Sequence, residues 1–339
     1  MKRFFIGSDV GKKEIHFTIY FEGKIILYKA IDNKKNDLKK YIKSAIALIQ
    51  SLCGNDNEYD VIVAMEHTGI YINKLIEVLV KMEVKASVIN AVKIKKTAGL
   101  DRGKNDKIDS KMIAEYAWRY FDALEIYSPM DPILMEIKTL SSERAKLVKS
   151  QGKLTQGRAD QKEFSDKVTS QFMAHNIKPT LKMLERAIKN IEERIVELIK
   201  TDAELKENYD LAISVPGIGP VTAGALLSYT NNFTKFDNAK QLGCYCGVVP
   251  FERSSGILKG KGQVSKKGNM VLKTLLTMGA WSICGSKNHF GQYYTRKLKE
   301  NKKKSLAINN LRNKMLKTVF ACVKNKTMYR YDYVHSLAA

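Results

Sequence analysis

Short apolar runs and longer periodic stripes alternate along the first third of this chain of 339 residues. Residues 3–31 contain three apolar runs (RFFIGSD, EIHFTIYF and GKIILYKAI) whose Phe, Ile and Tyr content predicts three strands in a meander. Helical periodicity follows at 36–52, then a buried strand at 60–66, a helix at 71–82, a strand at 84–90 and a helix from about 107. This order predicts an α/β domain with a mixed sheet.

Two acidic residues fall at the ends of predicted strands. Asp9 ends the first strand and Glu66 ends the fourth. Ligand sites in α/β sheets gather at the carboxyl ends of strands. Two further acids, Asp106 and Asp109, lie three residues apart at the start of the predicted helix, so both can face one site.

The middle of the chain is predicted to be helical. Pro179 and the polar stretch 158–170 separate two apolar stripes with heptad-like spacing. An antiparallel helical hairpin and a dimerising coiled coil both fit this pattern. The first stripe contains Ile133, Ile137, Leu140, Leu147 and Leu154, and the second contains Leu181, Leu184, Ile188, Ile191, Ile195 and Leu198.

The C-terminal part begins near residue 210 with SVPGIGPVTAGALLSY. Gly217 and Gly219 in PGIG indicate a helix-hairpin-helix turn whose N–H groups bind a phosphate, or equally a plain tight turn. A helix near 238–244, a loop at 247–269 and helices to about 325 are predicted next. The last dozen residues are expected to form a frayed tail.

Charge narrows the class of partner. The 58 Lys and Arg residues outnumber the 35 Asp and Glu residues, for a formal net charge of +23. Residues 251–320 hold 16 basic and only 2 acidic residues. Such a concentration indicates a nucleic acid partner, although a lysine-rich source would also raise the total. A second basic stretch precedes Asp106 and contains Lys93, Lys95, Lys96, Arg102 and Lys104.

Other compositional features exclude several classes. The five cysteines are scattered, and Cys244 and Cys246 have no second pair to complete a zinc site, so reduced thiols are expected. The chain opens without a signal peptide and has no run of about 18 apolar residues. These features predict a cytoplasmic protein, associated with the nucleoid when active, and no membrane partner.

The four acids Asp9, Glu66, Asp106 and Asp109 match what two-metal phosphodiester chemistry requires. Carboxylates neutralise a pair of divalent ions that clamp the attacking and leaving oxygens. Hard oxygen ligands favour Mg²⁺ or Mn²⁺. Taken singly, each acid is better explained by a role without catalysis, such as a helix cap or a solvated side chain.

The segments DVGKKEIHF, AMEHTGIY and GKNDKIDSKMIAEY, which carry these acids, resemble the DEDD transposases of the insertion sequence 110 family and the Piv-type DNA invertases. The similarity extends to SVPGIGPVTAGALLSY and GVVPFERSSG, in the same order. It implies an RNase H-like, RuvC-like domain at 1–125, a helical coiled-coil linker at 126–208, a transposase domain at 209–327 and a tail at 328–339.

The resemblance also implies a nucleophile. Family members attack DNA with a serine just before a glycine in this loop, which selects Ser255, with adjacent Ser254 as the alternative. The acids of the first domain would activate this serine in a composite site, completed across subunits if the protein is a dimer or tetramer. The surrounding lysines are expected to contact DNA phosphates, and they are Lys259, Lys261, Lys266 and Lys267.

The expected function is therefore a site-specific DNA recombinase that excises and inserts a mobile element. The resemblance further implies a structured guide RNA, encoded by the element, that pairs with donor and target DNA. The alternatives are a DNA invertase, a junction-resolving nuclease that cuts with metal-activated water, and a non-catalytic nucleic-acid-binding scaffold.

Overall fold

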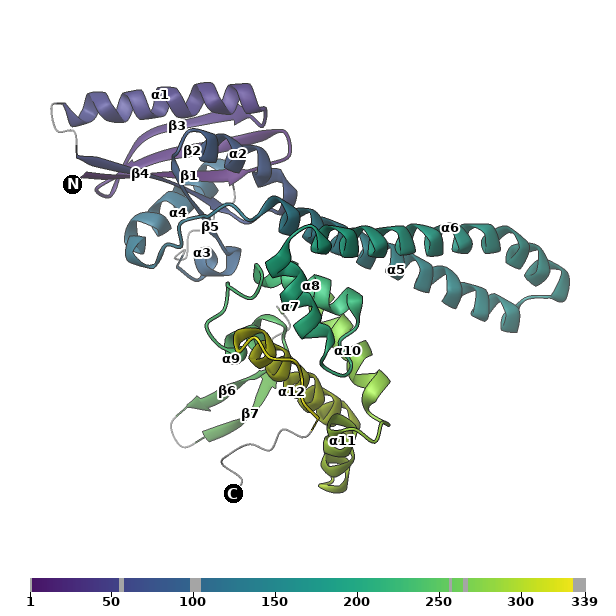
Figure 1. Ribbon diagram of the computed structural model, residues 1–339. Coiled ribbons are helices and arrows are strands. Elements are labelled where there is room, and N and C mark those ends of the chain that lie inside the picture. Colours follow the sequence, from purple (N-terminus) through teal and green to yellow (C-terminus); the bar gives the residue numbers. More distant parts are fainter. Residues whose placement is uncertain (1, 55–57, 98–104, 256–257, 265–267, 332–339) are drawn as a thin grey trace, which may run out of the picture. The chain divides into compact units, whose positions relative to one another are not determined.

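The computed structural model describes residues 2–54, 58–97, 105–255, 258–264 and 268–331. Within these ranges, only the backbone is described for 95–97, 158, 160–162, 252–255 and 258–263. The chain forms two compact units, Met1–Pro129 and Met130–Ala339, and each is described by itself (Figure 1).

Unit 1 is built on a five-stranded mixed sheet with the order β3-β2-β1-β4-β5. The first three strands, β1 (Lys2–Val10), β2 (Glu14–Phe21) and β3 (Lys24–Asp32), form the predicted antiparallel meander. Strand β4 (Tyr59–Glu66) pairs parallel with β1, and β5 (Lys85–Ile89) pairs parallel with β4. The predicted mixed sheet is confirmed.

Helices cover both faces of this sheet (Figure 1). On one face, α1 (Lys35–Cys53) and α2 (Asn73–Lys81) pack against alternate strand residues such as Phe4 and Ile6. On the other face, α4 (Asp106–Arg119) packs against Phe5. Because successive strand residues project to opposite faces, the odd-numbered positions of β1 face α4. The remaining elements are two 3₁₀ turns, Gly69–Ile72 and Phe121–Ala123, and α3 (Ala91–Thr97).

Gly7 lets α4 approach the sheet closely. A Cβ atom at this position would lie 2.2 Å from the Ser110 carbonyl oxygen and 2.4 Å from the Ala114 nitrogen. Both obstacles are helix backbone, which cannot rotate away. The buried hydroxyls of Thr18 and Ser110 form a hydrogen bond of 2.8 Å between β2 and the same helix. These contacts fix the height of α4 above β1 and β2.

Gly7→Ala is therefore expected to lower the free energy of unfolding of unit 1 by about 3 kcal/mol, the upper end of overpacking costs. Thermal denaturation of the full chain measures the loss. Gly152→Ala in α5 is the matched control, because a Cβ there meets nothing within 4 Å. That control should be neutral or stabilising by about 0.5–1 kcal/mol. Equal effects of the two substitutions would contradict this account of Gly7.

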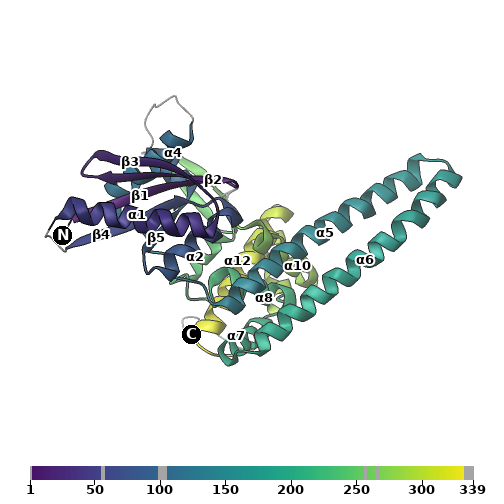
Figure 2. The same cartoon turned by 90° about the horizontal axis from the view of Figure 1, so that it is seen from above.

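Unit 2 begins with two long helices, α5 (Pro132–Phe164) and α6 (Lys167–Lys200). They lie side by side in both views (Figure 1, Figure 2) and are joined by ion pairs such as Arg144–Glu192, 2.6 Å between Nε and Oε1. The chain thus forms the antiparallel hairpin, one of the two arrangements that the sequence allowed. The predicted separation at Pro179 is wrong, because Pro179 lies inside α6. The break lies between Phe164 and Lys167, inside the polar stretch 158–170 that is also predicted to separate the two stripes.

The core of unit 2 surrounds α8 (Pro220–Thr230), which is buried from Thr222 to Thr230. Around it pack the ends of α5 and α6 that are remote from their connection, and α7 (Ala203–Ile213). Helix α10 (Met270–Ile283) also packs against α8, and α9 (Ala239–Tyr245), α11 (His289–Lys299) and α12 (Lys304–Lys324) complete the same core, with α12 in contact with α7, α9, α10 and α11. The prediction of a mainly helical remainder is confirmed.

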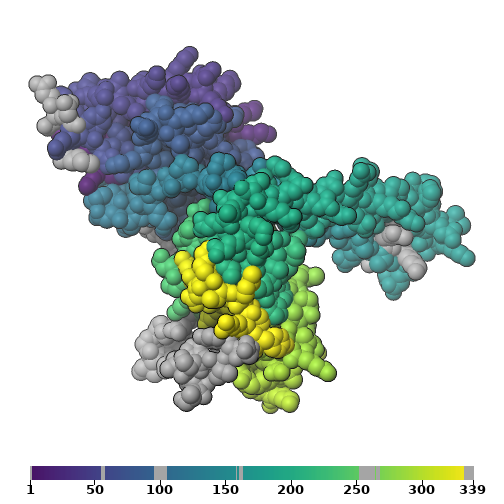
Figure 3. Space-filling view, viewed as in Figure 1, coloured from purple at the N-terminus to yellow at the C-terminus, as the bar shows by residue number. Residues whose placement is uncertain are grey.

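The far part of the α5–α6 hairpin projects from the rest of unit 2 (Figure 3). Large apolar side chains are exposed there, with Phe164 82% and Phe172 67% accessible. Among the helices of the described residues, none combines the length and apolar character needed to cross a membrane. All five cysteines are free thiols, and Cys53, Cys246 and Cys322 are buried.

Candidate functional site

The N-terminus of α4 presents two of the four predicted acids. Asn105 caps the helix, and its side-chain oxygen accepts hydrogen bonds from the backbone N–H groups of Lys107 and Ile108. Asp106 and Asp109 therefore occupy the first turn and are not the cap. Since Asn105 already satisfies these N–H groups, both carboxylates are free to serve another role.

Strand alternation brings the other acids to the face that α4 covers. Asp9 shares this face of β1 with Phe5 and Gly7, and Glu66 shares the corresponding face of β4 with Ala64. Strands β1 and β4 are parallel neighbours, so both acids lie at the same edge of the sheet. The prediction that strand-end acids meet at this edge follows from that pairing.

Three of the four acids converge. Carboxylate oxygens of Asp9, Asp106 and Asp109 all lie within 4.8 Å of one another, which is the spacing of ligands around a cation. Glu66 is outside this group but close enough to act electrostatically on Asp9. We call Asp9, Glu66, Asp106 and Asp109 the acid cluster. Its donor set consists of carboxylate oxygens, which suit Mg²⁺ and Mn²⁺.

The carboxylates of the acid cluster repel one another. Burial raises the pKa of Asp9 from 3.8 to about 6, and the carboxylates of Asp109, Asp106 and Glu66 add to this increase. Burial and like charges both disfavour the ionised form. A divalent cation would remove both penalties, so these residues fit a metal site.

A pH dependence follows for the metal-free protein. With a carboxyl pKa near 3.8 unfolded and about 6 folded, the native state binds more protons between these values. Stability should then fall as the pH rises from about 4 to about 6, by on the order of 1–2 kcal/mol after allowing for partial solvent access. Thermal unfolding in a chelator should show this fall, and Asp9→Asn should reduce it. An unchanged pH profile in Asp9→Asn would contradict the assignment.

A histidine that sequence reasoning missed adjoins the acid cluster. His16 on β2 is paired in register with Asp9 on β1. Its Nε2 lies 3.3 Å from an oxygen of Asp106 and 3.4 Å from an oxygen of Glu14, and its Nδ1 lies 2.6 Å from the Tyr28 hydroxyl. Glu14 and His16 flank Ile15 in β2, so the alternation of polar and apolar residues in the sequence could have revealed that they share one face of the strand. The pattern could not reveal which strand residue they oppose.

The basic residues upstream of the acid cluster are only partly described. Lys93 lies in α3 with its side chain exposed. Lys95 and Lys96 belong to the same helix, whereas Arg102 and Lys104 lie outside the described residues. Contact of these residues with DNA stays a prediction.

The predicted loop at 247–269 contains a β-hairpin, so its assignment as a loop is wrong. Strand β6 (Pro250–Ser255) pairs antiparallel with β7 (Leu258–Val264). Ser255 is the last residue of β6 and is paired with Leu258, and Ser254 is paired with Lys259. Lys261 also lies on β7, whereas Lys266 and Lys267 are outside the described residues.

The base of this hairpin is held by specific contacts. The Asn309 side chain donates a hydrogen bond of 2.8 Å to the Val248 carbonyl, and the Arg312 guanidinium donates one of 2.7 Å to Asn309. A Cβ on Gly268 would lie 2.7 Å from the backbone of Gly247, so the two chain segments touch at this point. The base of the strand that carries Ser255 is therefore held in place on unit 2.

The PGIG turn joins α7 and α8. Gly217 has φ +86°, and a Cβ there would meet the Gly279 carbonyl at 2.9 Å and Met315 at 2.7 Å. Close packing on α10 and α12 accounts for this glycine. Gly219 is exposed and caps α8 without a side-chain hydrogen bond. Phosphate binding by the turn stays a prediction.

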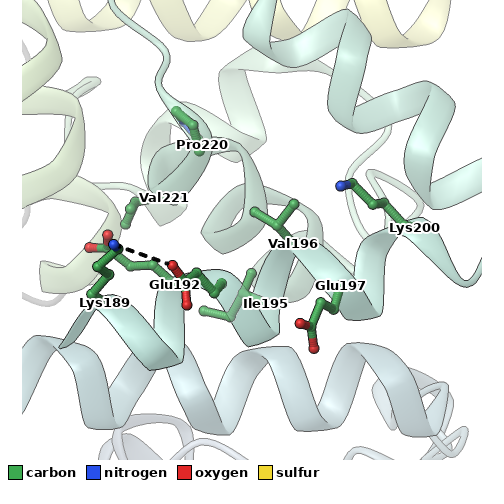
Figure 4. A pocket seen from close by; sticks show the side chains of 9 residues that line it. Lys189, Glu192, Ile195, Val196, Glu197, Lys200, Pro220 and Val221 are labelled. Atoms are coloured by element: carbon green, nitrogen blue, oxygen red, sulfur yellow. Dashed lines mark ion pairs between the residues drawn. The ribbon is translucent and has the colours of Figure 1, made fainter. Parts of the chain in front are cut away.

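A cavity of about 550 Å³ lies beside the N-terminus of α8 (Figure 4). Its lining includes Pro220 together with Glu192, Glu193 and Glu197 from α6. Lys189 in the same wall forms an ion pair of 3.7 Å with Glu193. The three carboxylates outnumber the two lysines of the lining, Lys189 and Lys200, so this wall is a poor site for a phosphate and the cavity differs from the acid cluster in chemistry.

Positive charge gathers around one tyrosine of α11. The Lys314 Nζ lies 4.5 Å from the centroid of the Tyr293 ring, the Arg296 Cζ 5.4 Å and the Lys297 Nζ 5.6 Å. Glu300 pairs with Lys297 at 2.7 Å. Burial and the nearby Arg296 lower the pKa of Lys314. An aromatic face ringed by cations is typical of surfaces that bind nucleic acid.

Comparison with known proteins agrees with this organisation. A family described as Transposase (DEDD_Tnp_IS110) matches residues 6–157, and the Transposase IS116/IS110/IS902 family matches residues 209–295. The chain is 25% identical to the pilin gene-inverting protein of Moraxella lacunata over 96% of this chain and 97% of that protein.

Two other relatives are similar over part of their length. A probable family 20 transposase of Pseudomonas aeruginosa is 27% identical over 47% of this chain, which spans about half (46%) of that relative. The transposase for insertion sequence element IS1111A of Coxiella burnetii is 28% identical over 45% of this chain and 44% of its own. A Thermus thermophilus RuvC structure aligns with 37% of this chain and 99% of its own at 11% identity, with a TM-score of 0.24.

Sequence relatives at both ends of the chain define an enzyme of the DNA transposase and recombinase class. The N-terminal and C-terminal parts of the chain are thus each similar to DEDD transposases of the IS110 type, and the pilin gene-inverting proteins are among its relatives.

Proposed function

We propose that this protein is a site-specific DNA recombinase that excises and inserts an insertion sequence. Its divalent metal ions, Mg²⁺ or Mn²⁺, would be held by Asp9, Glu66, Asp106 and Asp109, with Ser255 as the nucleophile. The observation that carries the proposal is the convergence of Asp9, Asp106 and Asp109 within 4.8 Å at the end of the sheet. Carboxylates gathered this closely are what phosphodiester chemistry with divalent ions requires.

The acid cluster has a defined part in this proposal. Bound divalent ions would supply Lewis-acid stabilisation of the phosphate oxygens during displacement. Asp9 holds its charge at a cost, since burial and three other carboxylates raise its pKa to about 6. The cluster is therefore arranged for cation binding. The repulsion among its carboxylates would be relieved only when a cation balances their charge.

Ser255 would act on the DNA backbone. Its hydroxyl oxygen attacks the phosphorus, a phosphoserine ester forms, and the bond from phosphorus to the leaving deoxyribose oxygen breaks. The hydroxyl proton passes to a base and the leaving oxygen takes up a proton. The phosphoserine ester conserves the energy of the broken phosphodiester bond, so that a second DNA end can displace the serine. Recombination needs this conserved energy, whereas simple hydrolysis does not.

The nucleic acid partners would be element ends, target DNA and a structured guide RNA. The net charge of +23 and the cations around Tyr293 support binding to phosphate backbones. The predicted contacts at Lys93, Lys259 and Lys261 would add to this surface. If pairing with the RNA selects the site, the protein reads backbone shape and leaves base recognition to the RNA.

A homo-oligomer, dimer or tetramer, is part of the proposal. Large apolar side chains at the projecting part of the α5–α6 hairpin, among them Phe164, Val168, Phe172 and Met183, are between 67% and 82% exposed. Exposed apolar patches favour contact with another protein surface. A second copy of this chain would cover them.

DNA inversion is the second candidate, and a specific observation favours it. The relative that matches this chain over 97% of its length is a pilin gene-inverting protein. The same chemistry would then act on two sites in inverted orientation. Recombination of plasmids that carry element ends, or alternatively an invertible segment, separates the two: the productive substrate identifies the reaction.

The proposed chemistry is tested by trapping its intermediate. Purified protein is incubated with Mg²⁺, element-end DNA and RNA transcribed from the flanking non-coding region, then denatured and resolved for protein bound covalently to labelled DNA. Formation of the covalent product supports the serine mechanism. Cleaved DNA with free ends and no covalent product would support a junction-resolving nuclease instead.

A further inference from the structure

His16 presents a nitrogen atom that the acid cluster does not account for. Its Nε2 is buried and forms no hydrogen bond to any residue that the structure describes, although carboxylate oxygens of Asp106 and Glu14 lie 3.3 and 3.4 Å away. The His16 side chain is 13% exposed. A buried ring nitrogen flanked by two carboxylates, outside hydrogen-bonding geometry, requires a physical explanation.

The ring is held from its other side. The His16 Nδ1 and the Tyr28 hydroxyl form a hydrogen bond of 2.6 Å, which orients the imidazole ring. When Nδ1 donates to the phenol oxygen, the Nε2 lone pair faces the two carboxylates. Metal-binding histidines are commonly oriented in this way by a partner at the second nitrogen.

The distances match those between ligands of a common ion. Donor atoms about 2.1 Å from one cation lie about 3.0–3.4 Å apart in octahedral or tetrahedral geometry. The two separations from Nε2 fall at the upper end of this range. Ligand atoms of Glu14, His16 and Asp106 all lie within 4.8 Å of one another.

We propose that Glu14, His16 and Asp106 form an additional divalent-cation subsite, sharing Asp106 with the acid cluster, and that its imidazole ligand favours Mn²⁺ over Mg²⁺. The proposal rests on the metal-dependent function proposed above. Imidazole nitrogen binds transition metals, whereas Mg²⁺ prefers oxygen ligands and retains its water. The subsite places a nitrogen ligand on β2, in register with Asp9. This ligand makes the site selective for Mn²⁺ over Mg²⁺.

Pulsed electron paramagnetic resonance tests the subsite without relying on activity. The untagged full chain is loaded with Mn²⁺ alone, and coupling to a directly bound ¹⁴N is recorded together with Mn²⁺ affinity. Wild type should show nitrogen coupling. His16→Gln should lose it and bind Mn²⁺ about 10-fold more weakly, with a much smaller change for Mg²⁺. Glu14→Gln, at an exposed position, should weaken Mn²⁺ binding and retain the nitrogen coupling.

His67→Gln is the matched control, because His67 follows Glu66 in sequence and its side chain is exposed. It should keep both the coupling and the affinity. Mn²⁺ bound to wild type without nitrogen coupling, or coupling that survives His16→Gln, would overturn the subsite and leave the proposed function intact. Failure of wild type to bind either Mn²⁺ or Mg²⁺ would overturn the metal-dependent function as well.

Discussion

Ser255→Ala is expected to abolish the covalent protein–DNA product and to lower strand exchange by on the order of 10³-fold or more, since loss of a nucleophile removes the reaction path itself. Alanine lacks the oxygen that forms the phosphoserine ester. The hairpin that carries Ser255 pairs through its backbone, and residue 255 remains able to pair with Leu258 after the substitution. DNA binding should therefore be unchanged.

Ser254→Ala is the control for this experiment, because Ser254 is the neighbouring residue of the same strand and is paired with Lys259. It should retain the covalent product. Loss of the product in Ser254→Ala alone would move the nucleophile by one residue. Cleavage that persists in both variants, with no adduct in wild type, would retire the serine mechanism.

Asp106→Asn is expected to reduce strand cleavage by on the order of 10³-fold while the chain remains folded, since the carboxylates must balance the charge of divalent ions. Asparagine keeps the shape of the side chain and removes its charge. The thermal stability of the metal-free variant should equal or exceed that of wild type, because Asp106 contributes to the raised pKa of Asp9. Cleavage assays and thermal melting in a chelator measure the two effects.

Asp122→Asn is the matched control, because Asp122 lies in the short 3₁₀ turn after α4 and is exposed. It should change neither cleavage nor melting temperature. If Asp106→Asn cleaved DNA at the wild-type rate under the same Mg²⁺ concentration, the acid cluster would not be the catalytic metal site. Lower melting temperature together with lost cleavage would indicate a structural role instead.

Much of unit 1 could be predicted because its determinants are local. Alternation of apolar residues defined the strands, and their ends carried Asp9 and Glu66. The spacing of Asp106 and Asp109 put both acids in one helix turn. The pairing of Asp9 with His16 depends on the turn between β1 and β2, which determines register, and no residue pattern reports register directly.

The errors in unit 2 also have physical causes. Strand β7, LKGKGQV, is rich in glycine and lysine and has a single β-branched residue, so propensity gave no indication of a strand. Proline removes one helix hydrogen bond, yet the apolar stripe that follows Pro179 packs well enough for α6 to continue through it. Tertiary packing overrode local preference in both cases.

The electrostatic crowding around Asp9 also affects how this gene decays. In the metal-free state, a copy that loses one acid of the cluster is relieved of repulsion and folds at least as well as its parent, so selection against misfolding does not remove it. Its basic surfaces survive the mutation. Inactive copies of the element would then accumulate, and they would encode well-folded proteins that bind nucleic acid and compete with the active enzyme. This competition would limit movement of the element within the genome.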